Sequence, residues 1–259
     1  MSTAAMTLKQ VRYENKAFWR NPASAFFTFV FPLMFLVIFN SLFKGTINIE
    51  ISPEVFRKVN SNYFYVPAIG AFSVITATYV NLAISISFSR DMGTLKRIRG
   101  TPLPAGAYML SRIVHAMFVC IILITIVVLA GIFFYDVDLP TEFLGGFILT
   151  VLVGGASFCA LGLALTAIIP NADASPAIVN ATVLPLQFIS GIFIPLDNAP
   201  DWIVNISKFF PIYHLAQAMQ GPFNPFDPEF KGNDLLIVAI WGVVGLALAV
   251  RFFTWEPRK

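Results

Sequence analysis

Six long stretches of apolar residues divide the chain, with polar or proline-rich segments between them. Each approaches the roughly 20 residues that a helix needs to cross the hydrocarbon core of a bilayer. None alternates apolar and polar residues as the strands of a membrane β-barrel do. The pattern predicts an all-α membrane protein with six transmembrane helices, at Ala23–Phe43, Phe64–Phe88, Ile113–Tyr135, Phe143–Ile169, Ala174–Ile194 and Leu235–Val250.

The residues before the first span, 7–20, have an amphipathic pattern. Apolar side chains fall near one helical face and most basic ones lie elsewhere: Leu8, Val11, Phe18 and Trp19 against Lys9, Arg12, Lys16 and Arg20. This favours an N-terminal elbow helix in the membrane interface, which Asn21-Pro22 turns into the first span. The alternative is a plain basic flank that only sets topology.

A proline-rich segment, 195–232, separates the last two spans. It holds six prolines, and the apolar pieces between them are too short to cross a membrane. Such pieces can dip into a bilayer and return where protein covers their backbone. We expect an extracellular, re-entrant segment here, and the alternative is an ordinary structured outer loop.

Charge is scarce and unevenly placed. Charged residues make up 12% of the chain and hydrophobic ones 57%, whereas a soluble domain has roughly 25% charged residues. With the N-terminus inside, the inner segments hold 12 of the 17 Lys and Arg, as the positive-inside rule requires. We therefore expect a multi-pass protein of the cell (inner or plasma) membrane with both termini cytoplasmic. A net charge of +3 is too small to suggest a nucleic-acid partner.

The loop between the second and third spans, 89–104, carries a dense group of charges. A short helix is expected to open at Asp91-Met92, where an acidic residue suits the first turn, and Thr101-Pro102 and Leu103-Pro104 end it. A short, stiff, charged helix can transmit force to a cytoplasmic partner. The alternative is that these charges only anchor the loop to anionic lipid.

Two of the predicted spans have a polar face. Thr78, Asn81 and Ser85 are three and four residues apart in the second span, and Asn180 and Gln187 are seven apart in the fifth. These side chains are candidates for a solute path or for a seam between packed helices.

Several classes of function are disfavoured. The predicted spans contain no Asp, Glu, Lys or Arg, which argues against proton coupling but not against sodium coupling through backbone carbonyls. The sequence lacks a P-loop, an H-E-x-x-H motif and a G-x-S-x-G motif, so it predicts no ATP site, no metal site and no catalytic residue. A transporter of this kind needs energy from outside the membrane.

At this point the residues resemble a known family, the ABC-2 type membrane subunits of ATP-binding-cassette exporters, including drug and antibiotic exporters. The resemblance covers nearly the whole chain, and the elbow segment is part of it. In the first loop the family pattern E-x-G-T-L-E followed by T-P is matched by Asp91, Gly93, Thr94, Leu95, Thr101 and Pro102, with Lys96 in place of the second acid. In the outer segment the family's order of Gly, Pro, Pro, an aromatic residue and Pro is matched by Gly191, Pro195, Pro200, Trp202 and Pro211.

The resemblance implies one transmembrane domain, 1–259, that is not an enzyme by itself. It implies a dimer with a second permease subunit, identical or related, bound to two ABC ATPase subunits that hold the ATP and Mg²⁺; no cofactor is expected in this chain. Loop 89–104 would be the coupling helix. Its predicted contacts with the ATPase are Arg90, Asp91, Gly93, Thr94, Lys96, Arg97, Arg99, Thr101 and Pro102. Spans two and five would lie near the dimer interface.

The prediction from the sequence is therefore an export permease for a hydrophobic or amphiphilic substrate such as a drug, lipid or glycolipid. The rival hypothesis is a secondary transporter or channel that ATP does not drive.

Overall fold

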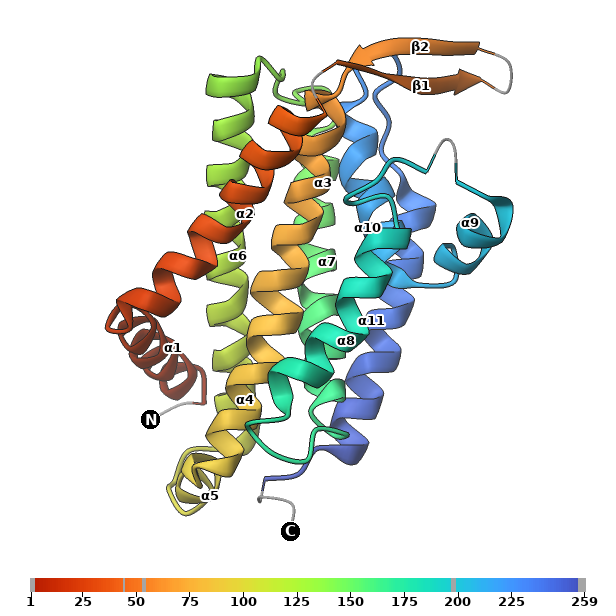
Figure 1. The fold of residues 1–259 in the computed structure, drawn as a ribbon. Helices are drawn as coiled ribbons and strands as arrows, with labels where there is room; N and C mark the ends of the chain where they lie inside the picture. Colours follow the sequence, from red (N-terminus) through yellow and green to blue (C-terminus); the bar gives the residue numbers. More distant parts are fainter. Residues whose placement is uncertain (1–2, 44, 53–54, 197–198, 256–259) are drawn as a thin grey trace.

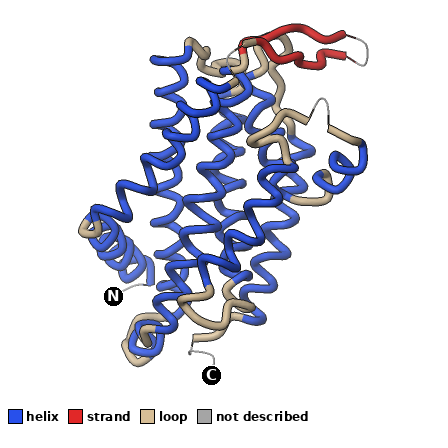
Figure 2. Tube along the Cα trace, in the orientation of Figure 1, coloured by secondary structure: helices blue, strands red, loops and turns tan. Residues whose placement is uncertain are grey.

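A computed structural model describes residues 3–43, 45–52, 55–196 and 199–255, with the backbone alone at 46–52, 55–59 and 105. The chain is predominantly helical (Figures 1 and 2). Its helices are α1 (Thr3–Trp19), α2 (Pro22–Leu42), α3 (Asn62–Ile75), α4 (Asn81–Asp91), α5 (Thr94–Arg99), α6 (Ala105–Tyr135), α7 (Leu144–Leu165), α8 (Ser175–Ile189), α9 (Asp201–Ser207), α10 (Pro211–Gln220) and α11 (Gly232–Phe252). A π-helical turn, Thr76–Val80, joins α3 and α4, and a 3₁₀ turn, Gly221–Phe223, follows α10.

Five of the described helical segments are long and apolar enough to cross a membrane. They are α2, the continuous segment Asn62–Asp91, α6, α7 and α11, and they match five of the six predicted spans within a few residues at most ends. The third predicted span begins too late, because α6 starts directly after Pro104. The predicted fifth span is the 15-residue α8, which stops at Ile189 before a turn at Gly191, where φ is +74°.

Figure 1 shows the long helices running side by side. The start of α1, the end of α11 and the short helix α5 lie at one end, which we call the α5 end. The opposite end carries α9 and a β-hairpin, and we call it the hairpin end. The termini of the described chain therefore lie at the same end of the bundle.

The hairpin was not predicted from the sequence. Strands β1 (Thr46–Ser52) and β2 (Val55–Asn60) pair antiparallel, with Thr46 opposite Asn60 and an irregularity between Glu50 and Ser52. Residues 46–60 contain no apolar run of membrane length, so the hydropathy pattern predicts no element there. The proline-rich segment 195–232 contains α9 and α10, of which α10 is largely buried.

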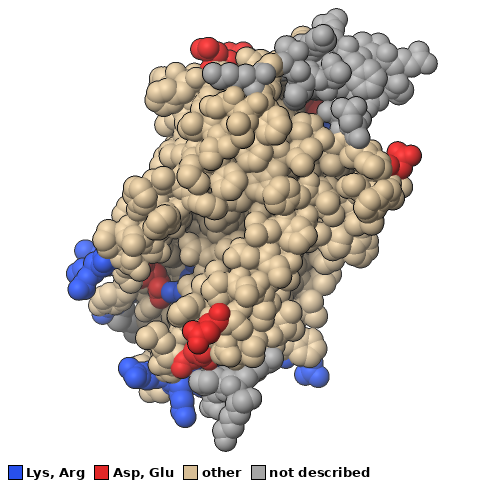
Figure 3. Space-filling model, in the orientation of Figure 1, with Lys and Arg blue, Asp and Glu red and all other residues tan. Residues whose placement is uncertain are grey.

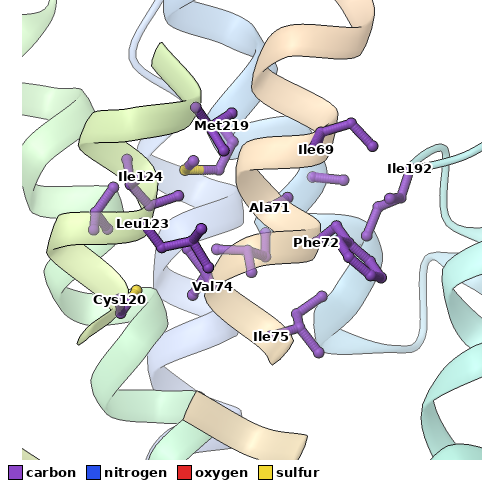
Figure 4. Close-up of a cluster of buried hydrophobic side chains, with 14 of the residues drawn as sticks. Ile69, Ala71, Phe72, Val74, Ile75, Cys120, Leu123, Ile124, Ile192 and Met219 are labelled. Carbon is purple, nitrogen blue, oxygen red and sulfur yellow. The ribbon is translucent and has the colours of Figure 1, made fainter. Parts of the chain in front are cut away.

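Helix α3 is the central pillar of the bundle. Every side chain from Tyr65 to Ile75 is buried, and the close-up in Figure 4 shows α3 residues such as Val74 meeting Leu123 and Cys120 of α6. Small residues permit this close packing: the α position of Gly70 lies beside Met219 of α10, and a Cβ there would sit 3.0 Å from its terminal methyl. A core built of shape-matched apolar side chains is what holds helices together where lipid surrounds them.

Helices α7 and α11 approach most closely at two glycines of α11. A Cβ at Gly242 would lie 2.9 Å from the Cα of Ser157, and one at Gly245 would lie 2.9 Å from the backbone nitrogen of Leu161. Glycine is therefore required at both positions for the two backbones to touch, as in other closely packed membrane helices.

This contact gives a prediction for stability. We expect Gly242→Ala to force α11 away from α7 and to lower the free energy of unfolding by about 1–3 kcal/mol, the usual cost of overpacking. Gly145→Ala in α7 is the matched control, because a Cβ there meets nothing within 4 Å. The measurement is the midpoint of thermal unfolding in detergent. Equal midpoints for the two variants would contradict the close contact.

Candidate functional site

The charged loop at the α5 end folds as two helices with a sharp turn between them. Helix α4 ends at Asp91, and Gly93 then takes a left-handed conformation with φ of +69°, which glycine adopts without strain. Helix α5 begins at Thr94, so the predicted helix start at Asp91-Met92 is wrong: Gly93 ends one helix before the next begins. The predicted stop is confirmed, since α5 ends at Arg99 and α6 starts after Pro104.

Helix α5 has a buried face and an exposed cationic face. Leu95 is fully buried and Ile98 is half-buried, in an apolar cluster that includes Tyr108 of α6 and Leu163 of α7. This cluster attaches α5 to the helix bundle. Most residues of the predicted ATPase contact lie on the exposed side: Thr94, Lys96, Arg97, Arg99, Thr101 and Pro102.

Arg90 differs from the other residues of that predicted set, because its side chain is completely buried. Its guanidinium donates hydrogen bonds to the carbonyl oxygens of Thr166 at 2.8 Å and Ile169 at 2.5 Å, and one nitrogen lies 3.4 Å from the Thr254 hydroxyl. Arg90 therefore satisfies carbonyl groups left open where α7 ends, and it connects α4 to the chain that follows α11. In this structure it binds within the chain and presents no surface to a partner.

Asp91 also binds the loop between α7 and α8. Its Oδ2 accepts a hydrogen bond of 2.6 Å from the backbone N–H of Ala172, in the loop between α7 and α8. Two adjacent residues of opposite charge thus hold one loop, the cation through carbonyl oxygens and the carboxylate through an amide. These contacts join the end of α4 to the loop that precedes α8.

The two predicted polar faces are not arranged as their spacing suggested. The π-helical turn Thr76–Val80 changes the helical register, so Thr78 is buried and faces α7 at Gly155. Asn81 and Ser85 instead line a cavity on another side of α4. The spacing of Thr78, Asn81 and Ser85 predicts one shared face only for an uninterrupted α-helix, and the sequence does not reveal the π-helical turn.

Helix α8 packs beside α4 without joining that cavity. The Tyr79 and Thr182 hydroxyls are 3.0 Å apart. Gln187 is buried, and its amide oxygen and nitrogen have no hydrogen-bond partner among the described residues. Asn180 is half-buried. The structure thus brings Asn81 and Ser85 together and leaves Asn180 and Gln187 on a separate helix.

The cavity beside Asn81 has a volume of about 170 Å³ and lies between α1, α2, α4 and α6; we call it the elbow cavity. An ion pair lies in its wall, where the Arg112 guanidinium is 2.5 Å from the Glu14 carboxylate. A second nitrogen of Arg112 donates to the Ser85 hydroxyl at 2.7 Å. These contacts tie α1 to both α6 and α4.

Sequence reasoning missed this ion pair. Glu14 is the only acidic residue of the basic segment 7–20, and Arg112 stands at the start of the third predicted span. In the sequence pattern, each bears only on the distribution of charge that predicts the membrane orientation. Because 98 positions separate them, nothing short of the tertiary fold could pair them.

His214 of α10 contacts protein groups through both ring nitrogens. One ring nitrogen of His214 lies 2.5 Å from an Asp234 carboxylate oxygen and the other lies 2.8 Å from the Lys208 carbonyl oxygen. In the part of the chain that the structure describes, no group of three or more His, Cys, Asp and Glu side chains is placed to hold a metal ion.

Known proteins are similar to this chain over most of its length. Residues 9–223 match the family model described as "ABC-2 type transporter". The match includes most of α1, the loop with α5 and the largely buried helix α10.

Three relatives also align. A protein of Bacillus subtilis (strain 168) named as a transport permease, YvfS, is 25% identical over 232 residues, which is 89% of this chain and 90% of the relative. One of Porphyra purpurea named as a transport permease, ycf38, is 26% identical over 88% of this chain and 76% of its own length. An Escherichia coli (strain K12) protein named as a multidrug ABC transporter permease, YbhR, is 26% identical over 60% of this chain and 42% of its own length.

The burial of Arg90 separates two roles that the sequence did not distinguish. We expect Arg90→Met to lower the thermal midpoint in detergent clearly, because losing hydrogen bonds from a charged donor costs about 1.5–3 kcal/mol. Arg97→Met removes the same charge from an exposed position and should leave the midpoint unchanged. Equal effects at the two positions would show that Arg90 does not hold the α5 end together.

Proposed function

The chain belongs to the ABC-2 type transporter family, and we propose that it is the permease of an ABC exporter driven through α5. Membership makes it a multi-pass membrane protein and a transport permease subunit of an ABC transporter. Such a subunit is not catalytic by itself, and a partner ATPase hydrolyses the ATP. The direction of transport, the membrane orientation and the roles of individual residues are parts of the proposal.

The observation that carries the proposal is the construction of α5. A lever that an ATPase can move must expose groups for the partner and be attached firmly to the membrane helices. Arg97 and Arg99 supply exposed cations, and Leu95 is fully buried in the cluster beneath them. The Arg90–Asp91 pair then connects α4 to the start of α8. In this proposal the partner offers an acidic groove, and it binds the ATP and Mg²⁺ that this chain does not hold.

The proposed orientation places the α5 end in the cytoplasm. Twelve of the 17 Lys and Arg then lie inside, and Figure 3 shows most of the basic atoms visible on that face at the lower end, with a broad neutral surface above. The described termini lie at one end, which supports an even number of crossings. We take α8 as the sixth span, lengthened toward the hairpin end by the residues after Ile189. The membrane is the cell membrane.

The transport path is proposed to lie where α8 meets a second permease subunit, identical or related. Helix α8 leaves one face exposed, at Ala177, Ala181, Leu184, Pro185 and Phe188. Asn180 and Gln187 belong to this helix, and Thr78, Asn81 and Ser85 belong to the neighbouring segment. Asn180 and Gln187 are proposed to line the path or to form the helix seam beside it. Thr78 turns toward α7, and Asn81 and Ser85 turn toward the elbow cavity, so these three are proposed for the helix seam. An uncharged path suits a hydrophobic or amphiphilic substrate such as a drug, lipid or glycolipid.

Reconstitution tests the proposal as a whole. The chain is purified with the ATPase that accompanies it and placed in proteoliposomes containing fluorescent amphiphiles. We expect ATP-dependent movement of the amphiphile away from the ATPase side, and loss of this movement when the P-loop lysine of the ATPase is replaced. Transport by the chain alone in response to an ion gradient would instead establish the secondary transporter.

A second experiment tests α5. The double substitution Arg97→Glu and Arg99→Glu should reduce co-purification of the ATPase at least about tenfold, because both new charges would repel an acidic groove. The thermal midpoint of the permease should not change, since both side chains are exposed. Lys9→Glu with Lys16→Glu is the matched control, with the same charge change at exposed positions of α1. Undiminished ATPase binding by the α5 variant would reject α5 as the contact.

A further inference from the structure

The elbow cavity is too small to enclose a whole drug or lipid molecule. Its volume is about 170 Å³. Pockets for drug-sized ligands measure about 300–1,000 Å³. The cavity therefore suits a small polar group, such as the headgroup of a lipid.

The polar groups around the cavity are not all satisfied within the chain. The Asn81 side chain lines it without a hydrogen bond to any described residue. The Nδ1 atom of His115, another lining residue, is buried and has no partner in the described chain. The buried Nδ1 atom lacks a partner at a cost in free energy, and the half-buried Asn81 amide can bind a ligand that enters the cavity.

The charges of the cavity have both signs. Among the described residues that line it, Glu14 is the only Asp or Glu and Arg112 the only Lys or Arg. Their side chains are 12% and 13% exposed, and the guanidinium has five N–H donors, of which the contacts to Glu14 and Ser85 use two. A site with a paired carboxylate and guanidinium has no net charge. It therefore matches a zwitterion better than a simple anion or cation.

The cavity lies at the elbow, where a lipid can reach it. Ala17 of α1 and Ser24 of α2 line it and are exposed, on either side of the turn at Asn21-Pro22. Just beyond, Phe26 and Phe27 are 58% and 65% exposed. Figure 3 shows a recess in the neutral surface on this side of the molecule, with acidic and basic atoms adjoining inside it. A headgroup can enter the recess while its acyl chains lie along the aromatic surface of α2.

We propose that the elbow cavity binds the phosphoethanolamine headgroup of a membrane lipid. The phosphate accepts hydrogen bonds from Arg112 and Asn81, and the ammonium donates to Glu14. A phosphocholine group has the same charges but no N–H donors, and a phosphoglycerol group lacks the cation. The inference rests on the proposed function only in placing α1 at the membrane interface, and it assigns the lipid no role as cargo.

Lipid binding to the purified, delipidated full chain tests this directly. Native mass spectrometry measures the Kd for dioleoyl phosphatidylethanolamine, phosphatidylcholine and phosphatidylglycerol. We expect phosphatidylethanolamine to bind about tenfold or more tightly than the other two. Soluble phosphoethanolamine should not compete at millimolar concentration. Equal Kd values for the three lipids would overturn the proposal, and tight binding of the soluble compound would replace the lipid by a free phosphoamine.

Two variants separate ligand binding from structural support. Asn81→Leu is similar in size and breaks no hydrogen bond within the described chain, so the lipid-free thermal midpoint should stay constant while phosphatidylethanolamine binds about tenfold more weakly. The exchange Glu14→Arg with Arg112→Glu retains an ion pair but reverses the charges, and it should abolish the preference over phosphatidylcholine. Glu142→Gln, at an exposed carboxylate, is the control and should bind as the wild type does.

Unchanged lipid preference in both Asn81→Leu and the charge exchange would reject the elbow cavity as the site. The measurement uses neither ATP nor the ATPase. Its failure therefore leaves the proposed export function untouched, and a failure of ATP-driven transport leaves this result standing.

Discussion

Arg90 is a fully buried cation on which the arrangement of the α5 end depends. An isolated charge removed from water is costly unless hydrogen bonds compensate it. Here the compensation comes from carbonyl oxygens of Thr166 and Ile169, which the end of α7 leaves open. The arginine thus gains hydrogen-bond acceptors, and the carbonyl groups gain a charged donor. The result fixes α4 against the loop that leads into α8.

The contacts of Arg90 also help to hold α5 in position. Helix α5 has only six residues and could not hold a position by itself. Its place is set by Leu95 in the apolar cluster and by Arg90 and Asp91 immediately before the Gly93 turn. In the proposed function, a movement of α5 would act on the loop before α8 through Arg90 and Asp91. The elbow is connected to the same helices, because Arg112 bonds to Glu14 of α1 and Ser85 of α4.

The bundle divides into tightly and loosely packed parts. The α7–α11 pair meets through Gly242 and Gly245, and α3 is buried from Tyr65 to Ile75. Helices α2 and α8 have faces that the rest of the described chain does not cover. Since lipid is as apolar as the helices, close contact between backbones is what distinguishes a fixed pair from a movable helix. Helix α8 has an exposed face, and the loop that precedes it is held by Arg90 and Asp91 at the end of α4.

The sequence by itself determined the membrane class, the position of most spans and the cationic loop, because these follow from local hydropathy and from proline and charge along the chain. It also carried the family resemblance, which the match over residues 9–223 established. It did not determine which charged residues face outward. Arg90 and Arg97 have the same side chain and stand seven positions apart, yet one is buried and the other exposed. Only the packing of α4 against the end of α7 decides that difference.

The same reason explains the remaining departures. Thr78 left the face of Asn81 because a π-helical turn intervenes, and such a turn is selected by tertiary contacts. Glu14 and Arg112 meet because α1 folds back on α6. The β-hairpin forms between two segments of one connection that hydropathy treats alike. The local sequence determines which secondary structure each segment can form. Which distant groups pair depends on where the folded chain removes them from water.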